Sequence, residues 1–348
     1  MAYSTITKPA LHFNSVLYVG NGGTKNVTGV GFRPDFVWMK VRDGTSSHGL
    51  FDVLRGVQKR ILSNSTDSQL TQSGLTSFDS DGFTLGSQGA INGNGGNHVA
   101  WNWKAADTTA TNNDGTVTTS VRANTTAGFS IVECDLSSAS GSVTLGHGLG
   151  ATPEFIMAKS KYDSGSAGSW FCFHKILPTN EYVALNNNAG QANDSGVWGS
   201  SPVNNNTFQI SNVSNWGGNR IVAYCFDSVP GYCQVGNYKG NGSSDGTFVY
   251  TGFKPAWIMM KRYDSGTQNW TIVDKSRIAY NEANYRLFPN LSDAESTSNK
   301  VNLFSNGFKF TDNASDNNSS NHSYLYVAIA EEPLVANVGA NGIPAPAR

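Results

Sequence analysis

The sequence predicts an all-β protein made of three tandem β-sandwich repeats, jelly-roll or lectin-like in type, with turns rich in glycine and asparagine. Composition is the first reason: of the 348 residues, 38 are glycine and 11% are aromatic, whereas only 14% are charged. Ordinary proteins contain about 7% glycine, and the residues that favour helices are scarce in this chain. The second reason is an internal repeat.

The repeat is defined by a block in which a turn with proline is followed by an apolar strand that ends in lysine. The lysine follows the proline by six positions in all three copies. The pairs are Pro34 with Lys40, Pro153 with Lys159, and Pro255 with Lys261. The apolar runs 36–39, 155–158 and 257–260 inside these blocks predict strands that are buried on both faces of a sandwich.

Four further blocks follow each lysine in a constant order. They are an apolar strand ending in Asp or His, a leucine with an Asn/Ser-rich loop, a turn with an alternating strand, and a closing apolar strand. The first three are marked by Asp52, His174 and Asp274, by Leu62, Leu185 and Leu287, and by Phe83, Phe208 and Phe308. Repeats of roughly 100 residues suit complete small β domains rather than the shorter repeats of a solenoid.

These blocks divide the chain into a first unit (1–105), a second unit (106–229) and a third unit (230–348). The Thr/Asn/Asp-rich stretch 106–117 reads as a linker within the second unit, and 228–234 marks the next boundary. The last 13 residues, 336–348, show no periodicity and predict an extended C-terminal tail.

Charge and hydropathy exclude several classes of protein. The 24 basic and 25 acidic residues leave a net charge of −1, whereas nucleic-acid binders carry a basic excess. No apolar run reaches the roughly 18 residues of a membrane helix, and the N-terminus lacks a secretory signal pattern. The four cysteines form no C-x-x-C motif, so we expect buried reduced thiols, with a Cys225–Cys233 disulfide as the alternative.

No known catalytic motif occurs, and the six histidines show no metal-ligand spacing, so we expect no enzyme activity, no metal and no cofactor. Asp52 and Asp274 each precede an arginine by three positions, Arg55 and Arg277. A pair that recurs in two units is more typical of a structural ion pair than of catalysis. The repeated lysines predict stems on aromatic surface with hydrated charges, with a ligand role as the alternative. The segment 79–82 predicts a turn rather than a calcium loop.

A binding role has one candidate region, the stretch 190–220 of the second unit, which the other units do not match. It carries Trp198 and Trp216 among Gly, Asn and Ser residues. A loop tryptophan stacks on a sugar face while neighbouring amides such as Asn215 bind its hydroxyls. We therefore predict a ligand site at Trp198, Trp216 and Asn215. The alternative is that both rings pack beneath their own loop as a satellite core.

The repeat blocks, together with the segments GNGSSDGTFVYTGFKPAWIMMKR and AEEPLVANVGANGIPAPAR, resemble a family of virion proteins of tailed phages from aquatic environments. Proteins of this type are described as tail-fibre or structural proteins, and the resemblance extends from about residue 16 to 348. It implies a β-rich, non-enzymatic component of the virion exterior, made in the host cytoplasm, and it brings no catalytic residues.

We therefore expect a head decoration protein, a head fibre or a tail appendage whose partners are other virion proteins. The alternative is a receptor-binding adhesin that recognises a host surface glycan. The three repeats are compatible with pseudo-threefold symmetry within one chain and equally with a homotrimer.

Overall fold

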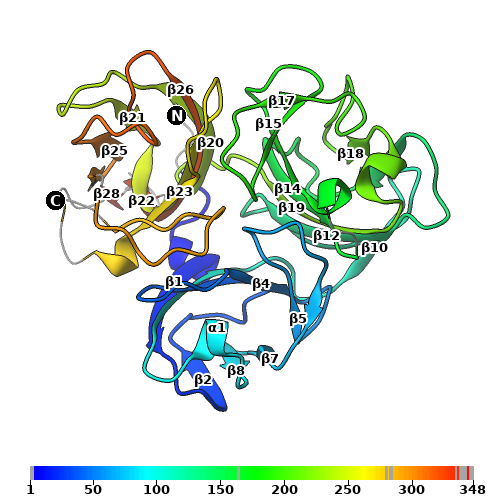
Figure 1. Ribbon diagram of the computed structural model, residues 1–348, viewed down its shortest axis with the longest axis horizontal. Helices are drawn as coiled ribbons and strands as arrows, with labels where there is room; N and C mark the ends of the chain where they lie inside the picture. Colours follow the sequence, from blue (N-terminus) through cyan, green and yellow to red (C-terminus); the bar gives the residue numbers. More distant parts are fainter. Residues whose placement is uncertain are drawn as a thin grey trace.

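The computed structural model of the protein describes residues 4–162, 165–278, 281, 285–298, 300–333, 335–336 and 343–344. The described chain is mostly β-structure arranged in several antiparallel sheets, with only short helices. The predicted all-β class is confirmed. Figure 1 shows three lobes around a common centre: the first unit in blue and cyan, the second in green, and the third in yellow and orange.

One strand order occurs in each of the three lobes. The orders are β1-β9-β3-β4, β12-β19-β14-β15 and β20-β26-β22-β23, the second lying within a sheet of eight strands. Hereafter these are the inner sheets. Their strands are β1 (Phe13–Val19), β3 (Phe36–Val41), β4 (Gly49–Asp52), β9 (Asn97–Trp103), β12 (Phe129–Asp135), β14 (Phe155–Ser160), β15 (Trp170–His174), β19 (Arg220–Phe226), β20 (Cys233–Lys239), β22 (Phe253–Arg262), β23 (Thr271–Asp274) and β26 (Ser323–Pro333).

A smaller outer sheet accompanies each inner sheet, with orders β2-β8-β7, β13-β18 and β21-β25-β24. The strands are β2 (Lys25–Thr28), β7 (Leu75–Asp79), β8 (Gly82–Leu85), β13 (Val143–Gly146), β18 (Thr207–Ile210), β21 (Phe248–Tyr250), β24 (Val301–Phe304) and β25 (Gly307–Phe310). The outer sheet of the second unit thus has two strands where the other two units have three.

The remaining elements are short. They are β5 (Lys59–Arg60), β6 (Leu70–Thr71), β10 (Ala110–Asn112), β11 (Thr119–Asn124), β16 (Glu181–Ala184), β17 (Ala192–Asn193), β27 (Val335–Ala336), β28 (Ile343–Pro344), α1 (Gly89–Asn92), and the 3₁₀ helices η1 (Pro9–Leu11), η2 (Gly165–Gly168), η3 (Val213–Trp216) and η4 (Lys275–Arg277). The predicted linker 106–117 contains β10, which pairs with β11. Most of the predicted tail lies outside the described residues.

The three strands with continuous apolar runs, β3, β14 and β22, are buried on both faces, as those runs predict. In β3 all six residues are buried. Successive side chains of a strand point to opposite faces, and Val37 and Met39 accordingly pack inside the first unit while Phe36 and Trp38 join a different cluster. Strands β3 and β14 therefore contribute to two clusters, one within their own unit and one between units, whereas both faces of β22 belong to a single cluster that joins the interior of the third unit to the core between units.

The core between units is a single aromatic-rich cluster that receives side chains from all three lobes. The ring of Phe36 stacks on Tyr224 of the second unit with centroids 4.2 Å apart. Trp103 meets Trp257 of the third unit edge to face at 5.4 Å. Aromatic pairs of this kind add stability beyond the burial of their area. The faces of the inner sheets that point toward the centre of Figure 1 are thus covered by neighbouring units.

Three hydrogen bonds join the units in a closed ring, each from an aromatic ring nitrogen of one unit to a loop carbonyl of another. The bonds are Trp170 Nε1 to Leu62 O (2.8 Å), Trp270 Nε1 to Ala184 O (2.9 Å) and His48 Nε2 to Phe288 O (3.0 Å). His48 Nδ1 accepts from Trp38 Nε1 at 2.9 Å, so the neutral ring carries its proton on Nε2 and donates to Phe288. Burial keeps His48 neutral, since it lowers its pKa well below the usual value.

A second ring consists of backbone hydrogen bonds from a loop of one unit to the strand end of the next. The bonds are Gln69 N to Lys161 O (2.6 Å), Gln191 N to Tyr263 O (2.7 Å) and Glu295 N to Arg42 O (2.6 Å). The three acceptors all lie two residues beyond the repeated lysines. The contacts between first and second, second and third, and third and first units are therefore of the same kind.

The repeated Asp–Arg pairs are buried ion pairs that also reach across these boundaries. Asp52 accepts from Arg55 Nε at 2.5 Å and from the Tyr224 hydroxyl at 2.7 Å. Asp274 accepts from Arg277 Nε at 2.6 Å, and from Trp101 Nε1 of the first unit at 2.9 Å. The structural interpretation of these pairs is confirmed.

The expectation that the repeated lysines keep their charges hydrated is wrong. Lys40, Lys159 and Lys261 are fully buried. Lys40 Nζ donates to Val41 O at 2.7 Å and Lys261 Nζ to Arg262 O at 2.6 Å, and burial lowers the pKa of each lysine to about 8. The strand end is covered by the adjoining unit, which the sequence of one unit does not reveal. The four cysteines are buried and free.

Candidate functional site: a pocket in the second unit

The second unit has a surface pocket of about 330 Å³ next to its two-stranded outer sheet. In the first and third units a third strand pairs Phe78 with Phe83 and Leu303 with Phe308. In the second unit this pairing is reduced to one bridge between Val203 and Phe208. The preceding residue is Pro202, which has no amide hydrogen for a longer ladder. The pocket, which Val203 and Pro202 help to line, is the consequence of a shortened strand.

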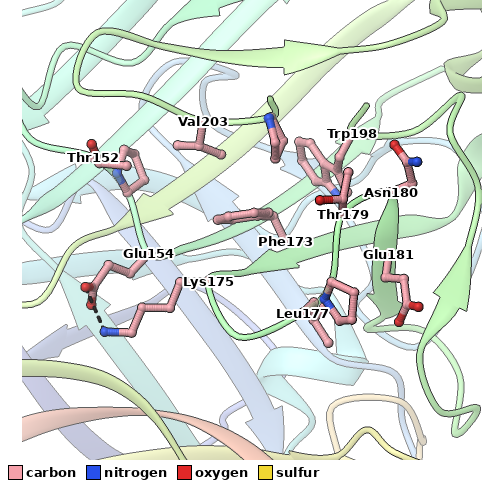
Figure 2. A pocket seen from close by; sticks show the side chains of 13 residues that line it. Thr152, Glu154, Phe173, Lys175, Leu177, Thr179, Asn180, Glu181, Trp198 and Val203 are labelled. Carbon is pink, nitrogen blue, oxygen red and sulfur yellow. Dashed lines mark hydrogen bonds and ion pairs between the residues drawn. The ribbon is translucent and has the colours of Figure 1, made fainter. Parts of the chain in front are cut away.

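Aromatic side chains form one wall of the pocket (Figure 2), where Phe173 and Trp198 lie with ring centroids 6.2 Å apart. Phe173 belongs to β15, at the register position that Phe51 occupies in β4 and Val273 in β23. Those two residues are buried, whereas Phe173 is partly exposed. The shortened strand therefore leaves the ring of Phe173 partly exposed, whereas the equivalent side chains of the other two units are covered.

The opposite side of the pocket is polar. Lys175 Nζ pairs with Glu154 Oε1 at 2.7 Å, the contact drawn as a dashed line in Figure 2. The hydroxyl of Ser228 donates to the other carboxylate oxygen of Glu154. Burial and the neighbouring Glu154 raise the pKa of Asp227. The Lys175–Glu154 pair is thus held by Ser228, which lies in the segment that leads into the third unit.

Further polar groups come from the start of β16 and the loop before it. Thr179, Asn180 and Glu181 line the pocket, and Oε2 of Glu181 is buried without a hydrogen-bond partner. A site with an aromatic wall and a small number of placed polar groups can bind a sugar unit or a short peptide segment, through stacking and hydrogen bonds together.

The structure brings together two of the three residues predicted from the sequence. Trp198 and Trp216 meet edge to face with centroids 5.4 Å apart, and their exposed fractions are 1% and 0%. Both rings belong to the core of the second unit, and Trp198 also lines the pocket. Asn215 donates instead to Asp194, at 3.2–3.3 Å. The alternative of a satellite core describes the two rings better, and ligand binding by these residues stays a prediction.

Sequence reasoning missed Phe173, Lys175 and Glu154. One signal was present, because the second unit replaces the repeated Asp by His174 and so departs from the other units next to Phe173 and Lys175. The proline that shortens the third strand was a second signal. Neither identifies a pocket until the outer sheets are compared.

The described part of the chain contains no group of three or more His, Cys, Asp or Glu side chains arranged to hold a metal ion. The turn 79–82 is held by Asp81, whose carboxylate accepts from the backbone amides of Gly29 and Gly31. Among the described residues no helix has the length and hydropathy of a membrane span.

Fold and pocket together define an all-β protein that carries an aromatic and polar pocket on one lobe. The family model for a domain of unknown function, DUF7483, matches residues 8–333, so the chain belongs to that family. No curated protein and no solved structure matches the chain.

Proposed function

We propose that the protein is a non-enzymatic structural component of the exterior of a tailed-phage virion, built from three copies of one β-sandwich unit. The proposed location is a head decoration, a head fibre or a tail appendage. Its basis is the resemblance of the repeat blocks to phage virion proteins, together with an architecture suited to a rigid surface component.

Repetition of the sandwich is supported by the register of equivalent strands. Trp38 pairs with Trp101 in the first unit, Met157 with Tyr224 in the second, and Met259 with Val327 in the third. All six residues occupy the positions that the sequence repeat assigns to them.

The observation that carries the proposal is the closed ring of contacts between units. Because every central face is covered by a neighbouring unit, the chain buries its large aromatic core without needing a partner. The outer sheets face outward (Figure 1) and leave three separate surfaces for other virion proteins. This arrangement favours a monomer with pseudo-threefold symmetry over a homotrimer, which light scattering on the purified protein distinguishes.

The test is the location and copy number of the protein in purified particles. Quantitative mass spectrometry and antibody-gold electron microscopy should find tens to hundreds of copies for a decoration protein. A few copies at the tail would indicate an appendage. Absence from purified particles, with the protein free in the lysate, would overturn the proposal.

The pocket favours a second candidate function, a receptor-binding adhesin that recognises a host surface glycan. Thr179 and Asn180 lie at the pocket on a surface loop and are suitable for substitution without loss of the core. An adhesin should retain host cells in a pull-down, and the double variant Thr179→Ala/Asn180→Gly, in which glycine tolerates the positive φ of Asn180 (67°), should release them. Equal retention by the variant would contradict a role for the pocket.

A further inference from the structure

The outer sheet of the third unit carries aromatic rings on its solvent face. In β21 the side chains of Phe248 and Tyr250 are 45% and 62% exposed, while Val249 between them is buried. Phe304 of β24 is partly exposed on the same face. These three residues are called the aromatic face.

The other two units provide an internal control for this face. Val249 pairs with Phe308 as Val27 pairs with Phe83 and Leu145 with Phe208, which fixes the equivalent positions. Phe248 corresponds to Asn26 and Thr144, Tyr250 to Thr28 and Gly146, and Phe304 to Asp79 of the first unit. Folding of the unit therefore does not require aromatic side chains at these positions, and exposed rings here need another explanation.

Two of the three rings are in direct contact. Phe248 and Phe304 meet edge to face with centroids 6.2 Å apart. Gly307 lies between Tyr250 and Phe304 in the sheet, and a Cβ at Gly307 would lie 2.1 Å from Val249 O. That position must be glycine for backbone reasons, as Gly82 must be beside Val27 O in the first unit. No side chain therefore separates Tyr250 from the two phenylalanines.

Polar groups border the rings on one side. Lys309 lies between Phe248 and Asn302 in the adjacent row of the sheet. Lys309 Nζ is paired with Asp245, and Asn302 is partly buried, with its Oδ1 covered by other atoms and without a hydrogen-bond partner. The aromatic face is thus bordered by a cation, a carboxylate and an amide.

We propose that the aromatic face, bordered by Lys309 and Asn302, binds a saccharide. The C–H groups on one side of a sugar ring carry partial positive charge and are attracted to the negative face of an aromatic ring. The hydroxyls at the edge of that sugar would reach the exposed pair of Lys309 and Asp245. The inference rests on the proposed function as a component of the virion exterior, and it adds to the pocket of the second unit a separate saccharide-binding surface on the third unit.

The size of the face favours a saccharide over a protein partner. A stable protein interface buries about 800 Å² on each side and places its apolar residues at a desolvated centre. Three rings with a charged pair directly beside them are too small and too polar for such a centre. A second copy of the chain is therefore an outcome of the test rather than the proposal.

The test replaces the two most exposed rings by the residues of the first unit, Phe248→Asn/Tyr250→Thr. The control variant, Leu17→Thr/Val19→Thr, removes two similarly exposed apolar side chains from β1. The intact chain and both variants are applied to an array of defined bacterial surface oligosaccharides, and thermal unfolding verifies that each is folded. The single variant Tyr250→Thr is the substitute if the double variant is unfolded.

We expect the unchanged protein and the control to bind at least one oligosaccharide and the aromatic-face variant to bind at least tenfold more weakly. Equal binding by that variant, or no binding to any oligosaccharide by the unchanged protein, would overturn the proposal. Self-association that the variant abolishes, without saccharide binding, would assign the face to a second copy instead. If only the saccharide proposal is wrong, the protein is still found in purified particles. If the proposed function is wrong, the protein is absent from them.

Discussion

The second unit and the first unit share an inner sheet of the same strand order, yet they differ at two neighbouring places. The first unit has a third outer strand and a buried Asp52–Arg55 pair. The second unit has a single bridge at Val203 in place of the strand, and His174 in place of the aspartate. Where the strand is complete the surface is closed, and where it is shortened there is a pocket.

The change to histidine follows a change in the neighbouring unit. Asp52 faces the hydroxyl of Tyr224, and Asp274 faces the indole of Trp101. His174 lies beside the backbone of Tyr326, and the residue equivalent to Tyr224 there is Val327, which has no donor. An aspartate at this boundary would be buried without its second partner. The side chain at the end of each of these strands therefore matches the side chain that faces it from the neighbouring unit.

The largest effect is expected from breaking a pair across a boundary. Asp52→Ala leaves the guanidinium of Arg55 buried without a carboxylate and should cost about 3–5 kcal/mol of unfolding free energy. The control is Asp135→Ala, which breaks the exposed pair with Arg220 and should cost at most about 1 kcal/mol. Urea denaturation measures both, and equal losses would contradict the distinction between buried and exposed pairs.

Removal of a ring beside the pocket should have the next largest effect. Trp198→Ala should cost about 3 kcal/mol, at the low end for a buried tryptophan, because the space that the ring vacates adjoins the open pocket and can fill with water. The measurement is again the urea midpoint, accompanied by cell binding. A folded, equally stable variant that no longer binds cells would instead favour the ligand role predicted for Trp198.

Replacing His174 by the aspartate of the first unit should destabilise the protein by less than the loss of Trp198. His174→Asp places a carboxylate opposite Val327 with no arginine three positions later, and should cost about 1–3 kcal/mol. Adding Leu177→Arg restores the Asp–Arg spacing and should recover part of the loss. Thermal unfolding of the single and double variants measures the difference, and a double variant less stable than the single one would contradict the pairing.

The smallest effect, between pH 6.5 and 5, is a dependence of stability on pH. Burial lowers the pKa of His174 from 6.5 to about 3, so the folded state resists protonation that the unfolded chain accepts. The resulting stability is complete above pH 6.5 and is lost as the pH falls toward 3, by up to about 1.4 kcal/mol per pH unit for one proton. His174→Gln should flatten the dependence between pH 6.5 and 5, and an unchanged slope would contradict this.

The sequence predicted the repeating strands because each unit repeats the same proline-to-lysine spacing. It also predicted the Asp–Arg ion pairs, whose partners are three residues apart. It did not predict the shared central core. The continuous apolar run of β3 marks both faces of the strand as apolar but does not indicate which neighbour covers Phe36 and Trp38. The buried lysines were mispredicted for the same reason, since their cover comes from another unit.

The candidate site was predictable only in part. Trp198 was selected from composition, but its exposure depends on how far the third outer strand extends past Pro202. The aromatic face was not selected at all, because Phe248 and Tyr250 alternate with a buried valine like any half-exposed strand. Only the register between units reveals that these positions are polar or glycine elsewhere.

The closed ring of contacts has a consequence for chain connectivity. The boundary between the third and first units is made by noncovalent contacts alone, yet it has the same hydrogen bonds as the two boundaries that the chain crosses. Near the N-terminus, Ser4 lies against Gly231 and Pro333, close to where the third unit begins and ends. The architecture therefore has no obligatory starting unit, and a circular permutant that opens the chain between the first and second units should retain the same fold.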